Sequence, residues 1–255
     1  MLFDTHAHYD DEQFDPDRDA LLSSMPENNI GLIVNSCDSL EAIDKVLAIA
    51  DKYPFIYASV GIHPHMVGSL TEPDMETVKR ASTHERVVAI GEIGLDYYYD
   101  TAPRDIQRKW FSRQVELARE VHLPVIIHDR DAHKDTMDIL RACHAEAVGG
   151  VLHCFSGSVE MAREVLDLGM YIAFGGSLTF KKAVRPVEVA KYVPLDRIVL
   201  ETDSPYLAPE PNRGRRNSSL YMHHVAEKLA QIRQLSVEEI EHITTENAKR
   251  CFHIE

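Results

Sequence analysis

The sequence Leu2-Phe3-Asp4-Thr5-His6-Ala7-His8 joins a short apolar run directly to an acidic residue and two histidines. Apolar, β-rich runs recur along the whole chain, at Leu2–Phe3, Gly31–Asn35, Phe55–Val60, Val87–Ile90, Val125–Ile127, Gly150–Leu152, Met170–Phe174 and Ile198–Leu200. Segments with apolar residues at helical spacing separate most of them, at 21–30, 40–50, 106–121, 132–142 and 159–168. Strands that alternate with helices predict parallel pairing through right-handed crossovers.

Eight such runs in 255 residues favour an α/β fold of the (β/α)8 TIM-type barrel class. An open doubly wound sheet is the alternative, but it usually has fewer strands and a switch point in strand order. Two further amphipathic stretches, 220–232 and 236–250, are expected as closing helices, the second with Ser236 as N-cap and Glu239 three residues later. Because no linker rich in Gly, Ser or Pro divides the chain, we expect residues 1–255 to form one domain, although the length also allows two small ones.

The charge balance restricts the class of partner. The chain has 27 Lys and Arg against 41 Asp and Glu, a formal net charge of −14, which argues against coating nucleic acid or an anionic membrane through bulk positive charge. No apolar run approaches the roughly 20 residues that span a bilayer, and residues 1–10 do not resemble a signal peptide. We therefore expect a cytoplasmic protein without membrane contact, with a monomer favoured.

Polar residues at the ends of the expected strands indicate a metal centre. The carboxyl ends of barrel strands converge on one face, and His6 and His8, two apart in an extended segment, point the same way. The other candidates follow later strands: Glu92, His128, His153 and Asp203. Each alone has a simpler explanation, as a hydrogen-bonded loop histidine or a helix-capping carboxylate. Together, four imidazoles and two carboxylates are typical ligands of two divalent ions such as Zn, Mn, Co, Fe or Mg.

Several longer motifs resemble those of the TatD family of metal-dependent deoxyribonucleases, whose barrel belongs to the amidohydrolase-like group. The resemblance runs in order from residue 4 to about residue 252 and rests on His6–His8, Gly61–His65, Gly91–Asp96, His128–Arg130, His153–Gly157, Glu201–Leu207 and Thr244–Arg250. It implies a DNA-cleaving enzyme, a 3′–5′ exodeoxyribonuclease acting on single-stranded or frayed ends. The sequence departs from the family at Ser218-Ser219, where Glu-Pro commonly follows the Asn, and this puts the shape of that loop in doubt.

The resemblance also implies a division of ligands between two metal ions. His6, His8 and Asp203 would hold one ion, His128 and His153 the other, and Glu92 would bridge both. Two divalent ions about 3.5–4 Å apart can activate water and stabilise the leaving oxygen of a phosphodiester. Asp203 is the candidate that accepts the proton of the attacking water, with Glu92 as the second catalytic group.

Candidate substrate contacts lie outside this ligand set. His63 is expected to donate to a phosphate oxygen, and Arg130 to reach the same phosphate or to pair with Asp131 or Asp135. The loop residues Arg213, Arg215 and Arg216 form the densest basic cluster and suit phosphate oxygens, with pairing to Glu210 as the alternative. The run 97–99, three tyrosines, either stacks on a nucleobase or packs over the barrel rim.

Two other functions stay open from the sequence. The same metal ligands could hydrolyse a small amide, lactone or phosphoester, because one barrel supports many reactions. A non-catalytic metal-binding scaffold is the third interpretation, but a structural site has no need of open coordination positions.

Overall fold

A computed structural model describes all residues 1–255 and contains one sheet of eight strands in the order β1-β2-β3-β4-β5-β6-β7-β8. All neighbouring strands pair in parallel. The strands are β1 (Leu2–Ala7), β2 (Ile30–Ser36), β3 (Ile56–Val60), β4 (Val87–Asp96), β5 (Val125–Arg130), β6 (Gly150–Leu152), β7 (Tyr171–Phe174) and β8 (Ile198–Leu200). This order and direction confirm the predicted (β/α)8 barrel.

The barrel closes between its first and last strands through a short contact. Ala7 and Ser204 form an isolated parallel bridge. The backbone N–H of Asp203 donates to the His6 carbonyl at 2.9 Å, and that of His8 donates to the Ser204 carbonyl at 2.7 Å. The seam of the barrel therefore brings Asp203 next to His6 of β1 and to His8, which follows directly after this strand.

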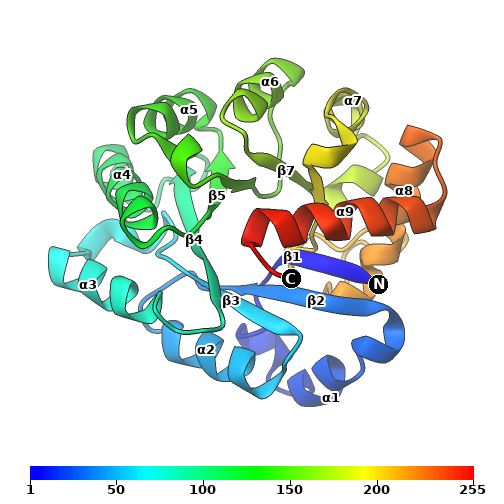
Figure 1. Cartoon of the computed structure of the whole chain (residues 1–255), viewed down its shortest axis with the longest axis horizontal. Helices are drawn as coiled ribbons and strands as arrows, with labels where there is room; N and C mark the ends of the chain where they lie inside the picture. The colour runs from blue at the N-terminus through cyan, green and yellow to red at the C-terminus, as the bar shows by residue number, and fades with distance from the viewer.

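Helices surround the strands, as Figure 1 shows. They are α1 (Arg18–Ser23), α2 (Ile43–Lys52), α3 (Glu72–Ala81), α4 (Arg104–Val121), α5 (His133–Ala142), α6 (Val159–Asp167), α7 (Val184–Tyr192), α8 (Met222–Arg233) and α9 (Val237–Phe252). None of them combines the length and the apolar composition that a bilayer crossing requires.

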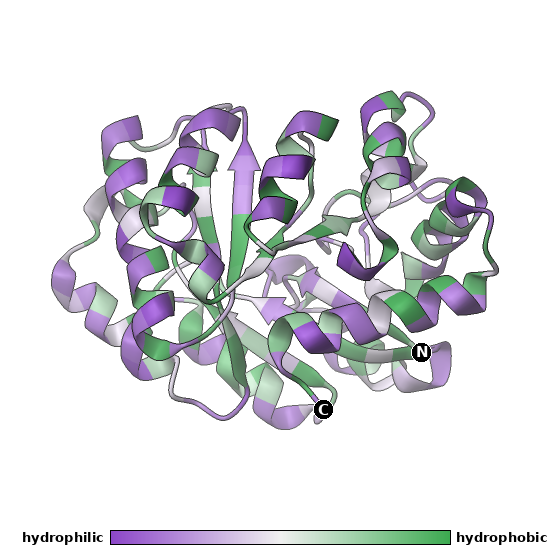
Figure 2. Cartoon of the chain, turned by 45° about the horizontal axis from the view of Figure 1, so that its top comes forward, coloured by the Kyte–Doolittle hydropathy of each residue, from purple (hydrophilic) through white to green (hydrophobic).

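Two apolar clusters form the core: 58 buried residues mainly between strands and helices, and 12 centred on the barrel interior. The inner cluster includes Phe3, Ile126 and Val151. Phe252 of α9 closes the barrel at the amino-terminal ends of the strands, and its ring centroid lies 6.0 Å from that of Phe3. Figure 2 shows the hydrophobic strands enclosed by helices that carry hydrophilic segments. Because α9 closes one end of the barrel, the opposite end is available for a site.

Several helix boundaries differ from the sequence prediction. The helix expected at 21–30 is correct only at its start, where α1 covers Arg18–Ser23. Pro26 begins a 3₁₀ turn and β2 starts at Ile30, because proline cannot continue a helix interior. The helices α3 and α7 were not predicted, because each buries only two residues and so has a weak apolar pattern. The capping box of Ser236 and Glu239 at the start of α9 is confirmed.

Three strands also continue beyond their apolar runs. Strands β1, β4 and β5 extend far enough to include His6, Glu92 and His128. The sheet therefore holds the backbone at all three positions, as expected for His6, whereas Glu92 and His128 were expected to follow their strands.

Candidate metal centre

A cavity of about 950 Å³ lies at the carboxyl ends of the strands and is lined by five of the six candidate ligands, whereas His6 is fully buried behind them. Residues two apart on a strand face the same side of the sheet. His128 follows the barrel-interior residue Ile126 at this spacing, and His153 follows Val151. The apolar barrel interior therefore continues directly into a polar cavity.

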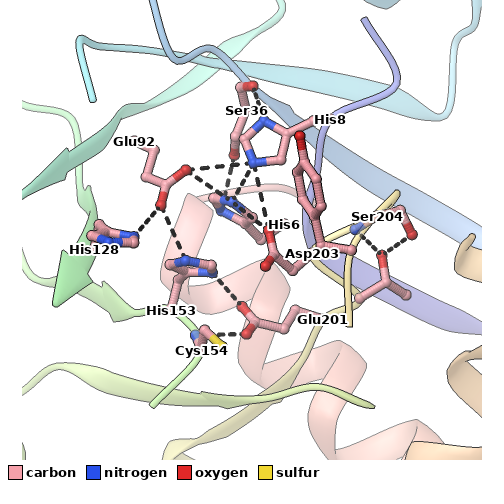
Figure 3. A network of polar contacts seen from close by, with 12 residues as sticks. His6, His8, Ser36, Glu92, His128, His153, Cys154, Glu201, Asp203 and Ser204 are labelled. Carbon is pink, nitrogen blue, oxygen red and sulfur yellow. Dashed lines mark hydrogen bonds and ion pairs between the residues drawn. The ribbon is translucent and has the colours of Figure 1, made fainter. Parts of the chain in front are cut away.

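Glu92 lies at the centre of the polar cluster and is almost completely buried. Its Oε1 lies 2.8 Å from His128 Nδ1 and 3.1 Å from His153 Nε2. Its Oε2 lies 3.3 Å from His6 Nε2 and 3.4 Å from His8 Nε2, as Figure 3 shows. Each carboxylate oxygen thus faces a different pair of imidazoles.

A glycine allows β4 to approach β5 closely enough for this arrangement. Gly94 has a φ of +150°, and a Cβ atom at this position would lie 1.9 Å from the carbonyl oxygen of His128. Any other residue would push the two strands apart. The separation of Glu92 and His128 therefore depends on Gly94.

The outer ring nitrogens of the candidate ligand histidines face oxygen atoms. His8 Nδ1 lies 2.9 Å from the Ser36 carbonyl, and His6 Nδ1 lies 3.1 Å from the Ser36 hydroxyl. His153 Nδ1 lies 3.3 Å from Glu201 Oε2, and His128 Nε2 lies 3.2 Å from a carboxylate oxygen of Asp96. In each neutral ring that donates to such an oxygen, the other nitrogen keeps its lone pair toward the cavity.

His63 differs from these four histidines. Its Nδ1 accepts the backbone N–H of His65 at 3.2 Å, so the proton of the neutral ring is on Nε2. This Nε2 lies 3.7 Å from Glu92 Oε1, at the edge of the cluster. His63 therefore presents a hydrogen-bond donor to the cavity.

Asp203 lies at the mouth of the cluster with 17% of its side chain exposed. Its Oδ1 is 3.6 Å from His8 Nε2 and 3.8 Å from His6 Nε2. The residue has a φ of +58°, an uncommon conformation for a residue other than glycine. The barrel seam holds it there through its backbone contact with β1.

Asp4 supports this seam from behind. Its carboxylate accepts hydrogen bonds from the Thr202 N–H at 2.9 Å, the Thr202 hydroxyl at 2.6 Å and the Ser219 hydroxyl at 2.6 Å. The Tyr9 hydroxyl contacts the same Ser219 side chain at 2.7 Å. The Ser218-Ser219 departure from the family pattern thus places a buried hydroxyl against Asp4, next to the segment that carries Asp203.

Burial and mutual charge set the pKa values of the cluster. Burial disfavours a charge on Glu92, but the imidazoles of His153, His6 and His63 outweigh it and hold the pKa of Glu92 well below its usual range. Burial also opposes the charged forms of His8 and His153, yet facing carboxylates, Glu92 among them, raise both pKa values well above normal. The pKa of His63 is well below normal, because burial dominates and the other imidazoles repel its charge.

The donor set fits a metal centre. Three groups of candidate ligand atoms lie within 4.8 Å of one another: His6–His8–Asp203, His6–Glu92–His153 and His63–Glu92–His128. His63 could join the third group only by losing its Nε2 proton, and His128 and His153, predicted to share one ion, fall in different groups. They combine imidazole nitrogen with carboxylate oxygen, the ligands of Zn and similar divalent ions. A bound cation would take the place of the protons that the raised pKa values keep on His8 and His153.

The predicted arginines separate into two groups. Arg130, Arg213 and Arg215 line the cavity. Arg216 does not, because its guanidinium pairs with both carboxylate oxygens of Asp17, at 2.8 and 2.6 Å. The structure therefore brings two of the three loop arginines to the site.

Sequence reasoning did not select Ser36, Asp96 and Glu201, which orient the ligand histidines. Asp96 and Glu201 lie within motifs already noted, Gly91–Asp96 and Glu201–Leu207. The available signal was a second carboxylate close in sequence to a candidate ligand: Asp96 lies four residues after Glu92 on β4, and Glu201 lies two residues before Asp203, just beyond β8. Ser36 offered no such signal.

Comparisons with known proteins agree with this geometry. The family described as "TatD related DNase" matches residues 3–253. An uncharacterized metal-dependent hydrolase of Bacillus subtilis, YabD, is 48% identical, with 100% of both chains covered. A protein of Cronobacter sakazakii named "3'-5' ssDNA/RNA exonuclease TatD" is 32% identical, with 98% of this chain and 97% of that protein covered. The crystal structure of YjjV, a TatD homologue of Escherichia coli, superposes with a TM-score of 0.93 at 31% identity and covers 100% of this chain and 98% of that one.

Proposed function

The chain belongs to the TatD family of metal-dependent hydrolases, and we propose that it removes nucleotides from single-stranded DNA ends in the 3′ to 5′ direction with two divalent ions. As a family member it is a hydrolase acting on ester bonds. The direction of digestion is supported by the name of the Cronobacter relative. The number of ions is part of the proposal.

The observation that carries the proposal is the position of Glu92 between two pairs of imidazoles. His6 and His8, with Asp203, would hold one ion, and His128 and His153 would hold the other. Glu92 would contribute one oxygen to each group. When bound, two divalent ions polarise the phosphoryl oxygen and lower the pKa of a water molecule.

The remaining residues of the cavity have complementary roles. Asp203 is partly exposed at the cavity mouth, where its carboxylate accepts the proton of the attacking water. His63 donates its Nε2 proton to a phosphate oxygen, and Arg130, Arg213 and Arg215 hold the phosphate through their guanidinium groups. The cavity lining also contains six carboxylates, so the bound ions together with the three arginines would supply the positive charge that attracts a phosphate to a protein whose net charge is −14.

The test uses single-stranded DNA labelled at its 3′ or its 5′ end, incubated with Mg²⁺ or Mn²⁺ or with chelator. Loss of the 3′ label first, abolished by chelator and by Asp203→Ala, is expected. Loss of the 5′ label first would refute the 3′ to 5′ direction of digestion. If metal-loaded protein cleaves no strand, the nuclease assignment fails and a small ester or amide becomes the substrate to test.

A further inference from the structure

Two exposed tyrosines lie at one edge of the metal cavity. Among the aromatic residues only Tyr98, Tyr99, Tyr192 and Tyr206 are exposed, and Tyr98 and Tyr99 are the most exposed at 60% and 58%. Tyr99 lines the cavity that contains Glu92. Tyrosine rings left in water beside a polar cavity are available for an aromatic ligand.

A guanidinium group lies against the same two rings. The Arg130 Cζ atom is 4.3 Å from the centroid of the Tyr98 ring and 5.0 Å from that of Tyr99. The carboxylate of Asp135, which could have paired with it, instead faces Arg108 at 3.3 Å. The charge of Arg130 therefore remains available at the rim.

A single carboxylate connects this rim to the metal centre. Asp96 Oδ1 accepts the backbone N–H groups of Tyr98 at 3.0 Å and Tyr99 at 2.9 Å. Asp96 Oδ2 lies 3.2 Å from Nε2 of His128, a candidate ligand, and 2.9 Å from Nε2 of His65. The tyrosines are thus held at a fixed position relative to the proposed cleavage site.

We propose that Tyr98, Tyr99 and Arg130 form a stacking site for one nucleobase of the strand whose phosphodiester lies at Glu92. The inference rests on the proposed function and names the substrate feature that the rim recognises. Aromatic rings and guanidinium groups stack on nucleobases, and every base has a π face, so the site holds a strand without reading its sequence. Arg130 can contact a phosphate from the same position.

The experiment measures binding of strands that lack a single base. A fluorescent single-stranded DNA with phosphorothioate linkages, which resist hydrolysis, carries one abasic nucleotide at successive positions. Its Kd for metal-loaded protein is measured by fluorescence anisotropy. One abasic position should weaken binding to the wild-type protein by about 5- to 150-fold, the range expected for one stacked base.

The paired variant is Tyr98→Ala with Tyr99→Ala. It should bind the intact strand more weakly by the same factor and should lose the penalty at that one position. The conservative Tyr99→Phe should keep the penalty, because the ring remains. A matched control is Tyr192→Ala. Tyr192 of α7 is also an exposed tyrosine beside an arginine, Arg163 of α6, whose Cζ lies 5.9 Å from the centroid of its ring, but neither residue lines the cavity.

Two outcomes would overturn the stacking site. An abasic penalty that is equal in wild-type protein and the double variant would place the base elsewhere, for instance on Phe180, over which Arg213 lies at 4.3 Å. No penalty at any position would exclude base stacking altogether. Failure of the proposed nuclease is distinguishable, because hydrolysis of unmodified DNA is measured separately: position-specific binding without hydrolysis refutes the nuclease and leaves the stacking site.

Discussion

Replacing Glu92 by Gln keeps the shape of the side chain but removes the charge that four imidazoles face. The carboxylate oxygens lie 2.8 to 3.4 Å from the inward nitrogens of His128, His153, His6 and His8. A glutamine offers one oxygen and one NH₂ group, so it can serve at most one of the two donor groups. We expect both groups to lose metal affinity while the barrel stays folded.

The magnitude follows from the position of Glu92. Changing a residue that only orients a ligand typically lowers metal affinity 10- to 100-fold. Glu92 is itself a candidate ligand for both groups, so the loss per group should reach at least about 100-fold, which corresponds to about 2.8 kcal/mol. In the proposed two-ion mechanism both groups must be occupied for turnover, so activity should fall by more than either affinity alone.

The assay measures metal content after dialysis, turnover on single-stranded DNA and the thermal unfolding midpoint. The matched control is Glu188→Gln, which removes the same charge from an exposed position on α7. Unchanged metal content and turnover in Glu92→Gln would refute the bridging role. Loss of the folded state in Glu92→Gln without bound metal would show that Glu92 is needed for folding itself.

Three further predictions follow from the same cavity. Asp203→Asn should lower turnover by about 10²- to 10⁴-fold, as expected for loss of a proton acceptor. Its metal content after dialysis should fall less than that of Glu92→Gln, and an equal fall would show that Asp203 acts chiefly as a metal ligand. Arg213→Ala with Arg215→Ala should raise KM for DNA and weaken the dependence of KM on salt. Arg216→Ala should leave KM unchanged and lower the free energy of unfolding by less than about 1 kcal/mol, since its partner Asp17 is at the surface. A raised KM in Arg216→Ala would contradict the assignment of substrate binding to Arg213 and Arg215 only. The pKa of His8 is raised, so this ring holds a proton near neutral pH in the metal-free protein. Metal binding should therefore release protons, and metal affinity should fall as the pH falls. Titration of Zn²⁺ into weakly buffered protein without acidification would contradict this proton release.

The sequence predicted the eight strands and the six candidate ligands, because both depend on local patterns. Apolar runs identify buried strands wherever they lie, and side chains at the carboxyl ends of parallel strands must share one face of a barrel. Ser236 and Glu239 predicted the start of α9 for a similar reason, since a capping box needs only four consecutive residues. The helix predicted at 21–30 ends at Ser23 despite the apolar spacing that follows, because Pro26 prevents its continuation.

Distances and partners came only from the tertiary structure. His8 and Ser36 are 28 residues apart, and Asp4 and Ser219 are 215 apart, yet each pair is hydrogen bonded. The same holds for the arginine loop: Arg213, Arg215 and Arg216 look equivalent in the sequence, but only Arg216 meets Asp17 across the barrel seam. A side chain's partner depends on which segments the closed barrel places next to it. The amino-acid sequence therefore determined which functional side chains lie at the carboxyl ends of the strands, and closure of the barrel decided which of those side chains contact one another.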